Sequence, residues 1–302
     1  TFPFMNLAAA FGTLVGVGAS TMASMLLGQK NYDVAKKVLG NVVVLNFLIG
    51  LLFTIVALAF LDPILYFFGA SENTISYARE YMEIILAGNV ITHIYFGLNS
   101  LLRSAGHPKK AMSATIMTVL LNASLDPLFI FTFDMGIRGA AVATILAQIV
   151  ALILVTYWFC DKRELIHFER GIFRLDRRIV KDSIVIGLAP FLMNFVACFV
   201  VIIINMRLKT YGGDLAIGAY GIVNRISFVF IMIVSGLTQG MQPIAGYNYG
   251  ARQMSRVYEV LKKTLLYGTV VLTAGFLIGE LCPGLVVSIF TDDPELKEKS
   301  IK

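Results

Sequence analysis

The chain has 302 residues, of which 57% are hydrophobic and only 15% are charged. A soluble domain of this length usually carries about 25% charged residues, so the composition excludes an ordinary soluble globular protein. The formal net charge of +6 does not indicate a nucleic-acid-binding protein. Its basic residues lie between long apolar runs and form no exposed face of a soluble module.

Five long runs contain no Asp, Glu, Lys or Arg. They cover residues 1–29, 38–61, 139–160, 183–206 and 226–251. An apolar helix of roughly 20 residues crosses the hydrocarbon core of a bilayer, so each run is long enough to span it. The runs lack the alternation of barrel strands, and backbone in lipid must satisfy its own hydrogen bonds. The sequence therefore predicts an all-α polytopic membrane protein.

The complete apolar pattern predicts eight spans. They cover about residues 3–27, 38–61, 80–103, 111–132, 137–160, 184–208, 217–248 and 258–290. Most Lys and Arg residues gather in the connections after the first, third, fifth and seventh spans. Because cytoplasmic loops are enriched in these residues, we expect those connections in the cytoplasm and residue 1 outside. The expected location is the inner (plasma) membrane of a bacterial cell.

Residues 161–183 form the longest polar connection, which is basic and amphipathic. Trp158 precedes it between two other aromatic residues, as expected for an aromatic belt at a membrane interface. We expect a linker on the cytoplasmic leaflet. It would join an N-lobe of five spans (residues 1–160) to part of a C-lobe with three spans (residues 184–302).

The two halves of the chain resemble each other at an offset of 222 residues, which pairs Gly18 with Gly240 and Gly28 with Gly250. Each half reads as a span, a basic turn containing glycine and a second span. A repeat of the same sense has its pseudo-twofold axis along the membrane normal. The repeat predicts two six-helix bundles, with one helix before the start of this chain and three beyond its end.

Polar residues interrupt two neighbouring spans. Asn122 and Asp126 are four residues apart and share a helix face, and Pro127 disturbs the helix and can free a backbone carbonyl. With a turn at 133–138, Thr144 would lie at the depth of Asp126, about 13 Å from the outer end. Oxygen ligands of this kind suit Na⁺ or a titrating proton. Ordinary interpretations remain open: a hydrated helix-end Asp, an interhelical Asn and a back-bonded Thr.

Three ordered motifs then identify a family resemblance. They are Asn99-Ser-Leu-Leu-Arg-Ser-Ala-Gly-His-Pro-Lys-Lys-Ala-Met112, Asn122-Ala-Ser-Leu-Asp-Pro-Leu128 and Gly136-Ile-Arg-Gly-Ala-Ala-Val-Ala-Thr144. Together with Gln242-Pro243 and Tyr247-Asn-Tyr-Gly250, they resemble the multidrug and toxic compound extrusion (MATE) family, in its bacterial DinF-like branch. The resemblance covers nearly the whole chain, as family helices two to nine.

The resemblance implies a cation or proton site in the first lobe. The matching residues here are Asn122, Asp126 and Thr144, with Tyr81 and Asn99 as neighbours from the preceding span. The family's acidic residue on helix one would precede this chain, which would leave the coupling site incomplete. Helix seven lacks the acidic residue of many relatives, so the implied substrate cavity would use Asn194, Asn205 and Gln242.

The expected function is multidrug efflux by antiport with H⁺ or Na⁺, through alternating access between two lobes. Expected partners are amphipathic, often cationic drugs and the lipid bilayer, with the protein acting as a monomer and without nucleic acid. A flippase for lipid-linked saccharide precursors is an alternative, although its cavity needs more basic residues than Arg225. A non-functional transporter fragment is another. The three His residues are scattered, so we expect neither an enzyme nor a cofactor; Na⁺ at Asp126, Asn122 and Thr144 is the expected metal.

Overall fold

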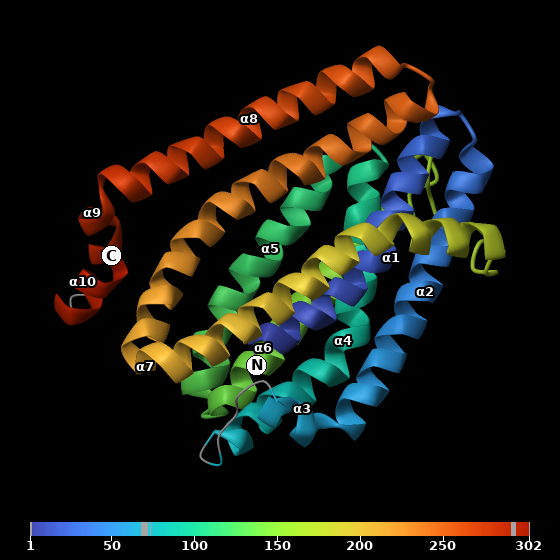
Figure 1. Ribbon diagram of the computed structural model, residues 1–302. Coiled ribbons are helices and arrows are strands. Elements are labelled where there is room, and N and C mark those ends of the chain that lie inside the picture. The colour runs from blue at the N-terminus through green and yellow to red at the C-terminus, as the bar shows by residue number, and fades with distance from the viewer. Residues whose placement is uncertain (1, 68–71, 73, 291–293, 302) are drawn as a thin grey trace. The chain divides into compact units, whose positions relative to one another are not determined.

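The computed structural model describes residues 2–67, 72, 74–290 and 294–301 (Figure 1). Within these ranges the regular structure is helical, without strands. The elements are α1 (Phe2–Gly28), α2 (Tyr32–Ala59), α3 (Leu61–Phe67), α4 (Ile75–Ser104), α5 (Pro108–Pro127), the π-helix η1 (Leu128–Thr132), α6 (Gly136–Phe159), α7 (Arg177–Gly250), α8 (Met254–Leu281), α9 (Pro283–Ser288) and α10 (Pro294–Ile301).

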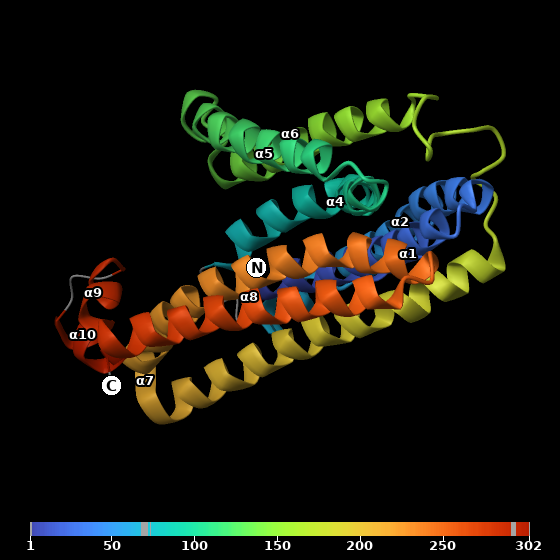
Figure 2. The same ribbon diagram turned by 90° about the horizontal axis from the view of Figure 1, so that it is seen from above.

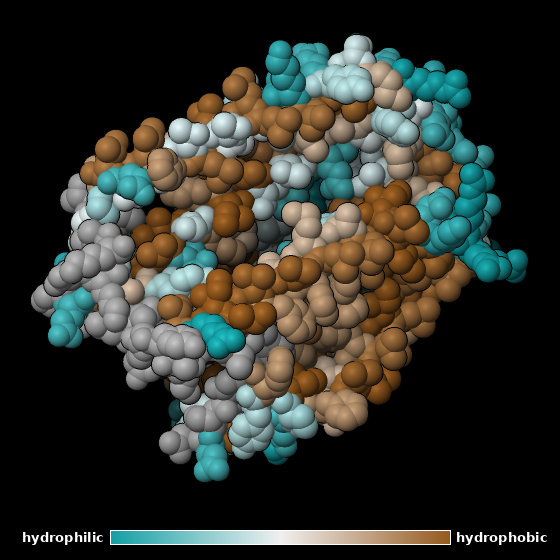
Figure 3. All heavy atoms as spheres, in the orientation of Figure 1, coloured by the Kyte–Doolittle hydropathy of each residue, from teal (hydrophilic) through white to brown (hydrophobic). Residues whose placement is uncertain are grey.

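Eight helical segments of the described chain are long and apolar enough to cross a membrane. The predicted number of spans and the all-α polytopic class are therefore confirmed, and the protein is a multi-pass membrane protein. In Figure 3 brown, apolar side chains cover the bodies of the helices. Teal, polar side chains gather at the end where the α1–α2 turn and the segment after α6 lie.

The last predicted span, residues 258–290, is wrong at its end. Helix α8 stops at Leu281, and α9 begins at Pro283. Proline has no backbone N–H and its ring clashes with the preceding turn, so a helix cannot continue through it without a kink. The apolar run continues past Pro283, which is why composition alone extended the span.

Two predicted spans belong to one helical element. Helix α7 runs from Arg177 to Gly250 and holds two membrane-length segments, Arg177–Val201 and Gly218–Gly250. Both ends of α7 pack against α1, at Gly18 and at Gly28. A straight helix of that length would reach about 110 Å, far beyond α1, so the chain reverses between the two segments.

Helix α4 is the centre of one compact unit, which comprises residues 1–198 and 246–252. It contacts α1, α2, α5 and α6, and Figure 2 shows it between the α5–α6 pair and the α1–α2 pair. The main core cluster joins Leu39 of α2, Leu98 and Leu101 of α4, and Val155 and Phe159 of α6, all fully buried. Between membrane helices such packing stabilises through close van der Waals contact, because lipid tails are as apolar as the buried side chains.

Glycines let α7 approach α1 closely at two crossings. A Cβ on Gly28 would overlap the carbonyl oxygen of Tyr247, and a Cβ on Gly250 would overlap that of Met25. These contacts are reciprocal, because Gly28 with Gly250 and Met25 with Tyr247 share the 222-residue offset. Isologous contacts of this kind are typical of a local twofold axis.

The other crossing has the same reciprocal form. A Cβ on Gly18 would overlap the carbonyl oxygen of Ser183, and one on Gly187 would overlap that of Leu14. Small residues, here Gly18 on α1 with Ser183 and Gly187 on α7, allow such close packing of membrane helices.

The second compact unit comprises residues 199–245 and 253–302. In it α8 packs against the second segment of α7, where a Cβ on Gly275 would lie 2.7 Å from the Phe230 ring. The lobe boundaries predicted at residues 160 and 183 remain predictions.

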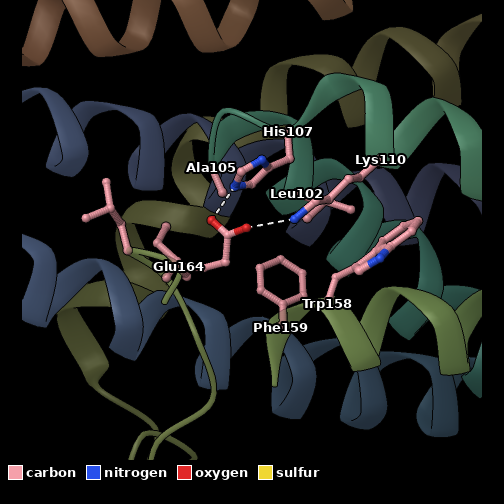
Figure 4. Close-up of a pocket in the computed structure, with 9 residues that line it drawn as sticks. Leu102, Ala105, His107, Lys110, Trp158, Phe159 and Glu164 are labelled. Atoms are coloured by element: carbon pink, nitrogen blue, oxygen red, sulfur yellow. Dashed lines mark hydrogen bonds and ion pairs between the residues drawn. The ribbon is translucent and has the colours of Figure 1, made fainter. Parts of the chain in front are cut away.

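A salt-bridge cluster of Glu164, Lys110 and His107, here called the clamp, holds the segment between α6 and α7 against the rest of the first unit (Figure 4). The Glu164 carboxylate accepts from Lys110 Nζ at 2.7 Å and pairs with His107 Nε2 at 2.6 Å. The Lys110 hydrogen bond, then the His107 contact, hold the pKa of Glu164 below its usual value. The clamp joins this segment to the turn between α4 and α5.

We expect this clamp to weaken in acid. A carboxyl with a lowered folded-state pKa stabilises the fold above its unfolded pKa of about 4.3, and that contribution is lost as the pH falls through the folded value. Hydrogen exchange of residues 161–168, corrected for intrinsic rates, should accelerate below about pH 4. Glu164→Gln should exchange fast already at neutral pH, whereas Glu169→Gln, at an exposed pair with Lys36, should exchange almost normally. Unchanged exchange in Glu164→Gln at pH 7 would contradict the clamp.

Candidate functional site

The candidate site lies on the α5–η1–α6 hairpin. Pro108 begins α5 at a position that needs no N–H donor, and Pro127 ends it before the π-turn η1. π-turns occur frequently at functional positions because they reorient the side chains beside them. Gly139 lets α6 pack directly on η1, since a Cβ there would lie 2.7 Å from the Phe129 backbone. The hairpin therefore brings the end of α5 beside the start of α6.

Asn122 connects the two helices at this point. Its Nδ2 donates to Asp126 Oδ1 at 3.1 Å and to Thr144 Oγ1 at 3.3 Å. The Thr144 hydroxyl in turn donates to the Ala140 carbonyl at 2.9 Å, so it is back-bonded to its own helix as well. All three side chains are half-buried. The sequence spacing thus predicted a contact that the fold makes.

Tyr81 and Asn99 have different positions on α4. Tyr81 is half-buried and lies near the Asp126 carboxylate. Asn99 lies about 27 Å further along the helix, where it donates to the Ala111 carbonyl at 3.0 Å and accepts from Arg103. The structure brings Tyr81 into the cluster and leaves Asn99 outside it, where it fastens α4 to the start of α5.

A cavity of about 250 Å³ adjoins the cluster inside the first unit. Its wall is mostly apolar, with polar residues from three helices: Asn6, Asn89, Thr92, His93, Thr144 and Gln148. Thr144 belongs to both the cavity wall and the polar cluster, so an event at Asp126 can reach the cavity through one side chain. A mostly apolar pocket with a few directed polar groups is typical of small-molecule sites.

Sequence reasoning missed the polar wall of this cavity. Thr92 and Gln148 hydrogen-bond across α4 and α6, and Asn89 donates to the Gly50 carbonyl at 3.3 Å. His93 is 1% exposed, and neither ring nitrogen has a hydrogen-bond partner among the described residues. The available signal was a cluster of polar side chains in an apolar span, where they are costly.

The second-lobe predictions are less informative. Asn194 is exposed and donates to the Pro190 carbonyl at 2.9 Å, and Gln242 is half-buried on α7. The side chain of Asn205 lies outside the described residues.

No group of three or more His, Cys, Asp and Glu residues that could hold a metal occurs in the described part of the chain. The Asp126 cluster offers one carboxylate, one hydroxyl and one amide. The amide presents its nitrogen to both oxygens. A flip of the Asn122 amide would present its oxygen instead, whereas a proton could bind Asp126 with the amide as it stands.

The fold and the site together define a polytopic helical membrane protein with a carboxylate in a membrane-length segment beside a mostly apolar cavity. The sequence model of the MatE family matches residues 1–128 and 190–302. The chain belongs to this family, and the family resemblance is confirmed.

The individual comparisons agree with this. Multidrug export protein MepA of Staphylococcus aureus (strain NCTC 8325 / PS 47) is 29% identical over 99% of this chain and 66% of its own length. A multidrug resistance MATE family transporter in an outward-facing conformation matches with a TM-score of 0.92 and 26% identity, over 99% of this chain and 67% of that one. A MATE structure in a bent conformation matches with a TM-score of 0.90, 26% identity and coverage of 99% and 66%. The chain thus spans about two thirds of its relatives.

Proposed function

We propose that the chain forms the ion-coupling part of a multidrug efflux antiporter. The relatives that it matches export drugs, and the observation that carries the proposal is the Asp126–Asn122–Thr144 cluster beside the cavity. Intramembrane ionisable residues mark ion and proton pathways because an isolated charge in lipid is costly. The protein is a transporter and not an enzyme.

In the proposed transport cycle Asp126, Asn122 and Thr144 act one after another. H⁺ or Na⁺ enters from outside and binds Asp126, and Asn122 responds because it holds both Asp126 and Thr144. The change at Thr144 alters the cavity wall, and an amphipathic, often cationic drug leaves before the two lobes rock to the opposite state. One charge that crosses a potential of 100 mV supplies about 2.3 kcal/mol.

The proposal also covers the oligomeric state, the membrane and the orientation of the protein. The protein acts as a monomer in the bacterial inner membrane, with the basic connections in the cytoplasm. The described residues that line the cavity include no Lys or Arg, which favours drug export over a flippase that must hold a pyrophosphate.

The test is efflux of a fluorescent cationic drug from proteoliposomes that hold the protein carrying this chain, under a Na⁺ or a pH gradient. Thr144→Val keeps the side-chain volume and removes the hydroxyl that accepts from Asn122. The concentration of the coupling ion at half-maximal efflux should rise roughly fivefold, as the loss of one hydrogen bond of about 1 kcal/mol implies. Thr264→Val, which removes a hydroxyl that donates within α8, is the control. Efflux that needs neither gradient would refute antiport.

A further inference from the structure

The segment of residues 160–176, here called the linker, packs against the helices of the first unit through buried side chains and hydrogen bonds. It begins where the α6 span ends and stops where α7 begins. Ile166 and Ile172 are buried in the main core cluster. Asn41 of α2 donates to the Arg174 carbonyl at 3.2 Å and accepts from the Asp176 backbone N–H at 2.9 Å. These anchors, with the Glu164 clamp, fix which side chains face outward.

The acidic side chains of this region are engaged within the protein. Glu164 holds Lys110 and His107, and Glu169 pairs with Lys36 at 3.1 Å. Asp161 and Asp176 accept backbone N–H groups, and Asp182 faces Arg178 at 4.0 Å. Three of these five carboxylates therefore already have a basic partner, while the two that accept backbone N–H groups keep their charge.

Six exposed cations in the same region have no ion pair with a described residue. They are Lys162, Arg163, Arg170, Arg174, Arg177 and Lys181. Between them Leu165, Phe173 and Leu175 are exposed by 56%, 47% and 46%. Phe173 stacks on Phe168, which packs against Phe159 at the end of α6, so this apolar face is held in place from the core.

We propose that the linker and the first turns of α7 bind the anionic headgroups of membrane lipids, with four cations of the linker and two of α7 on the phosphates and the three apolar side chains of the linker in the headgroup region. Connectivity places it at a membrane surface, because a span enters the bilayer at each of its ends. Basic residues interspersed with large apolar ones are typical of segments that lie in that interface. A nucleic acid would use the cations and leave the apolar residues exposed.

Trp158 provides the measurement, since it is the single tryptophan of the chain and lines the same small pocket as Leu165 (Figure 4). We would reconstitute the protein that carries this chain, with any tryptophan outside residues 1–302 replaced by phenylalanine, into phosphatidylcholine bilayers that contain either brominated phosphatidylglycerol or brominated phosphatidylcholine at equal fractions. Each Lys or Arg near an anionic surface changes binding roughly fivefold. The apparent binding constant from Trp158 quenching should therefore favour the anionic lipid by at least about fivefold.

Two matched triple variants and added salt test whether the preference for anionic lipid comes from the linker or from the net charge of the protein. The triple variant Arg163→Gln, Arg170→Gln, Arg174→Gln should bring the preference close to one. The matched control Arg252→Gln, Arg256→Gln, Lys262→Gln changes the net charge equally, at the α7–α8 connection and in the first turns of α8, and should keep the preference. In the unchanged protein, 1 M NaCl should also reduce it, because the Debye length falls to about 3 Å.

The lipid-binding proposal does not depend on the proposed transport function, because lipid binding is measured without an ion gradient. Equal quenching by the two lipids in the unchanged protein would overturn it. Equal loss of the preference in both triple variants would also overturn it, because the effect would then follow net charge and not the linker. The comparison of the two lipids in the unchanged protein tests the proposal even if the variants fail to fold.

Discussion

The Asp126→Asn variant of the protein that carries this chain should lose drug efflux while it still reaches the membrane. Asparagine keeps the size of the side chain and an oxygen that can accept from Asn122 Nδ2. It cannot carry a negative charge or take up a proton. For one charge moved at 100 mV the lost driving force is about 2.3 kcal/mol, which sustains a drug gradient of roughly fiftyfold.

The measurement is drug resistance and fluorescent-drug efflux in cells, normalised to the amount of protein in the membrane. Ser124→Ala is the matched control, since its exposed hydroxyl donates to the Leu120 carbonyl of the same helix; its efflux should be normal. Undiminished cation-driven efflux in Asp126→Asn would remove Asp126 from the coupling mechanism.

A methyl group at Gly28 should destabilise the protein strongly. The new Cβ would overlap the Tyr247 carbonyl oxygen, which is backbone and cannot move aside as a flexible side chain can. The two helices must separate, and overpacking of this kind costs about 1–3 kcal/mol or more. Gly18→Ala should behave alike, because its Cβ would overlap the Ser183 carbonyl oxygen.

Gly12→Ala on the same helix is the control, because this substitution should leave the stability unchanged or raise it. Its Cβ would meet the His93 ring at 3.8 Å, an ordinary contact, and alanine favours a helix over glycine by about 1 kcal/mol. Thermal unfolding in detergent should therefore give a lower midpoint for Gly28→Ala and an equal or higher one for Gly12→Ala. Equal midpoints for the two variants would show that the α1–α7 crossing is not tight.

Local features were predictable. The eight spans follow from the length of apolar runs, and the Asn122–Asp126–Thr144 cluster follows from a four-residue spacing and a short hairpin. Asn99 was placed with the site by family resemblance alone, but α4 carries it to the far end. His93 lies among polar side chains of an apolar span, but this pattern did not predict Gln148 as its neighbour, because the two meet at the cavity only through the packing of α1, α4 and α6.

The sequence by itself determined that this is a helical membrane protein of the MatE family, since hydropathy and motif order are properties of short segments. It also paired Gly28 with Gly250 as equivalent residues of a repeat. Only the tertiary structure decided that these two glycines meet each other's neighbouring carbonyls, that Thr144 joins the Asp126 cluster to a cavity, and which linker cations stay free. Contacts between helices depend on crossing geometry and on backbone approach, which no spacing along a single helix contains.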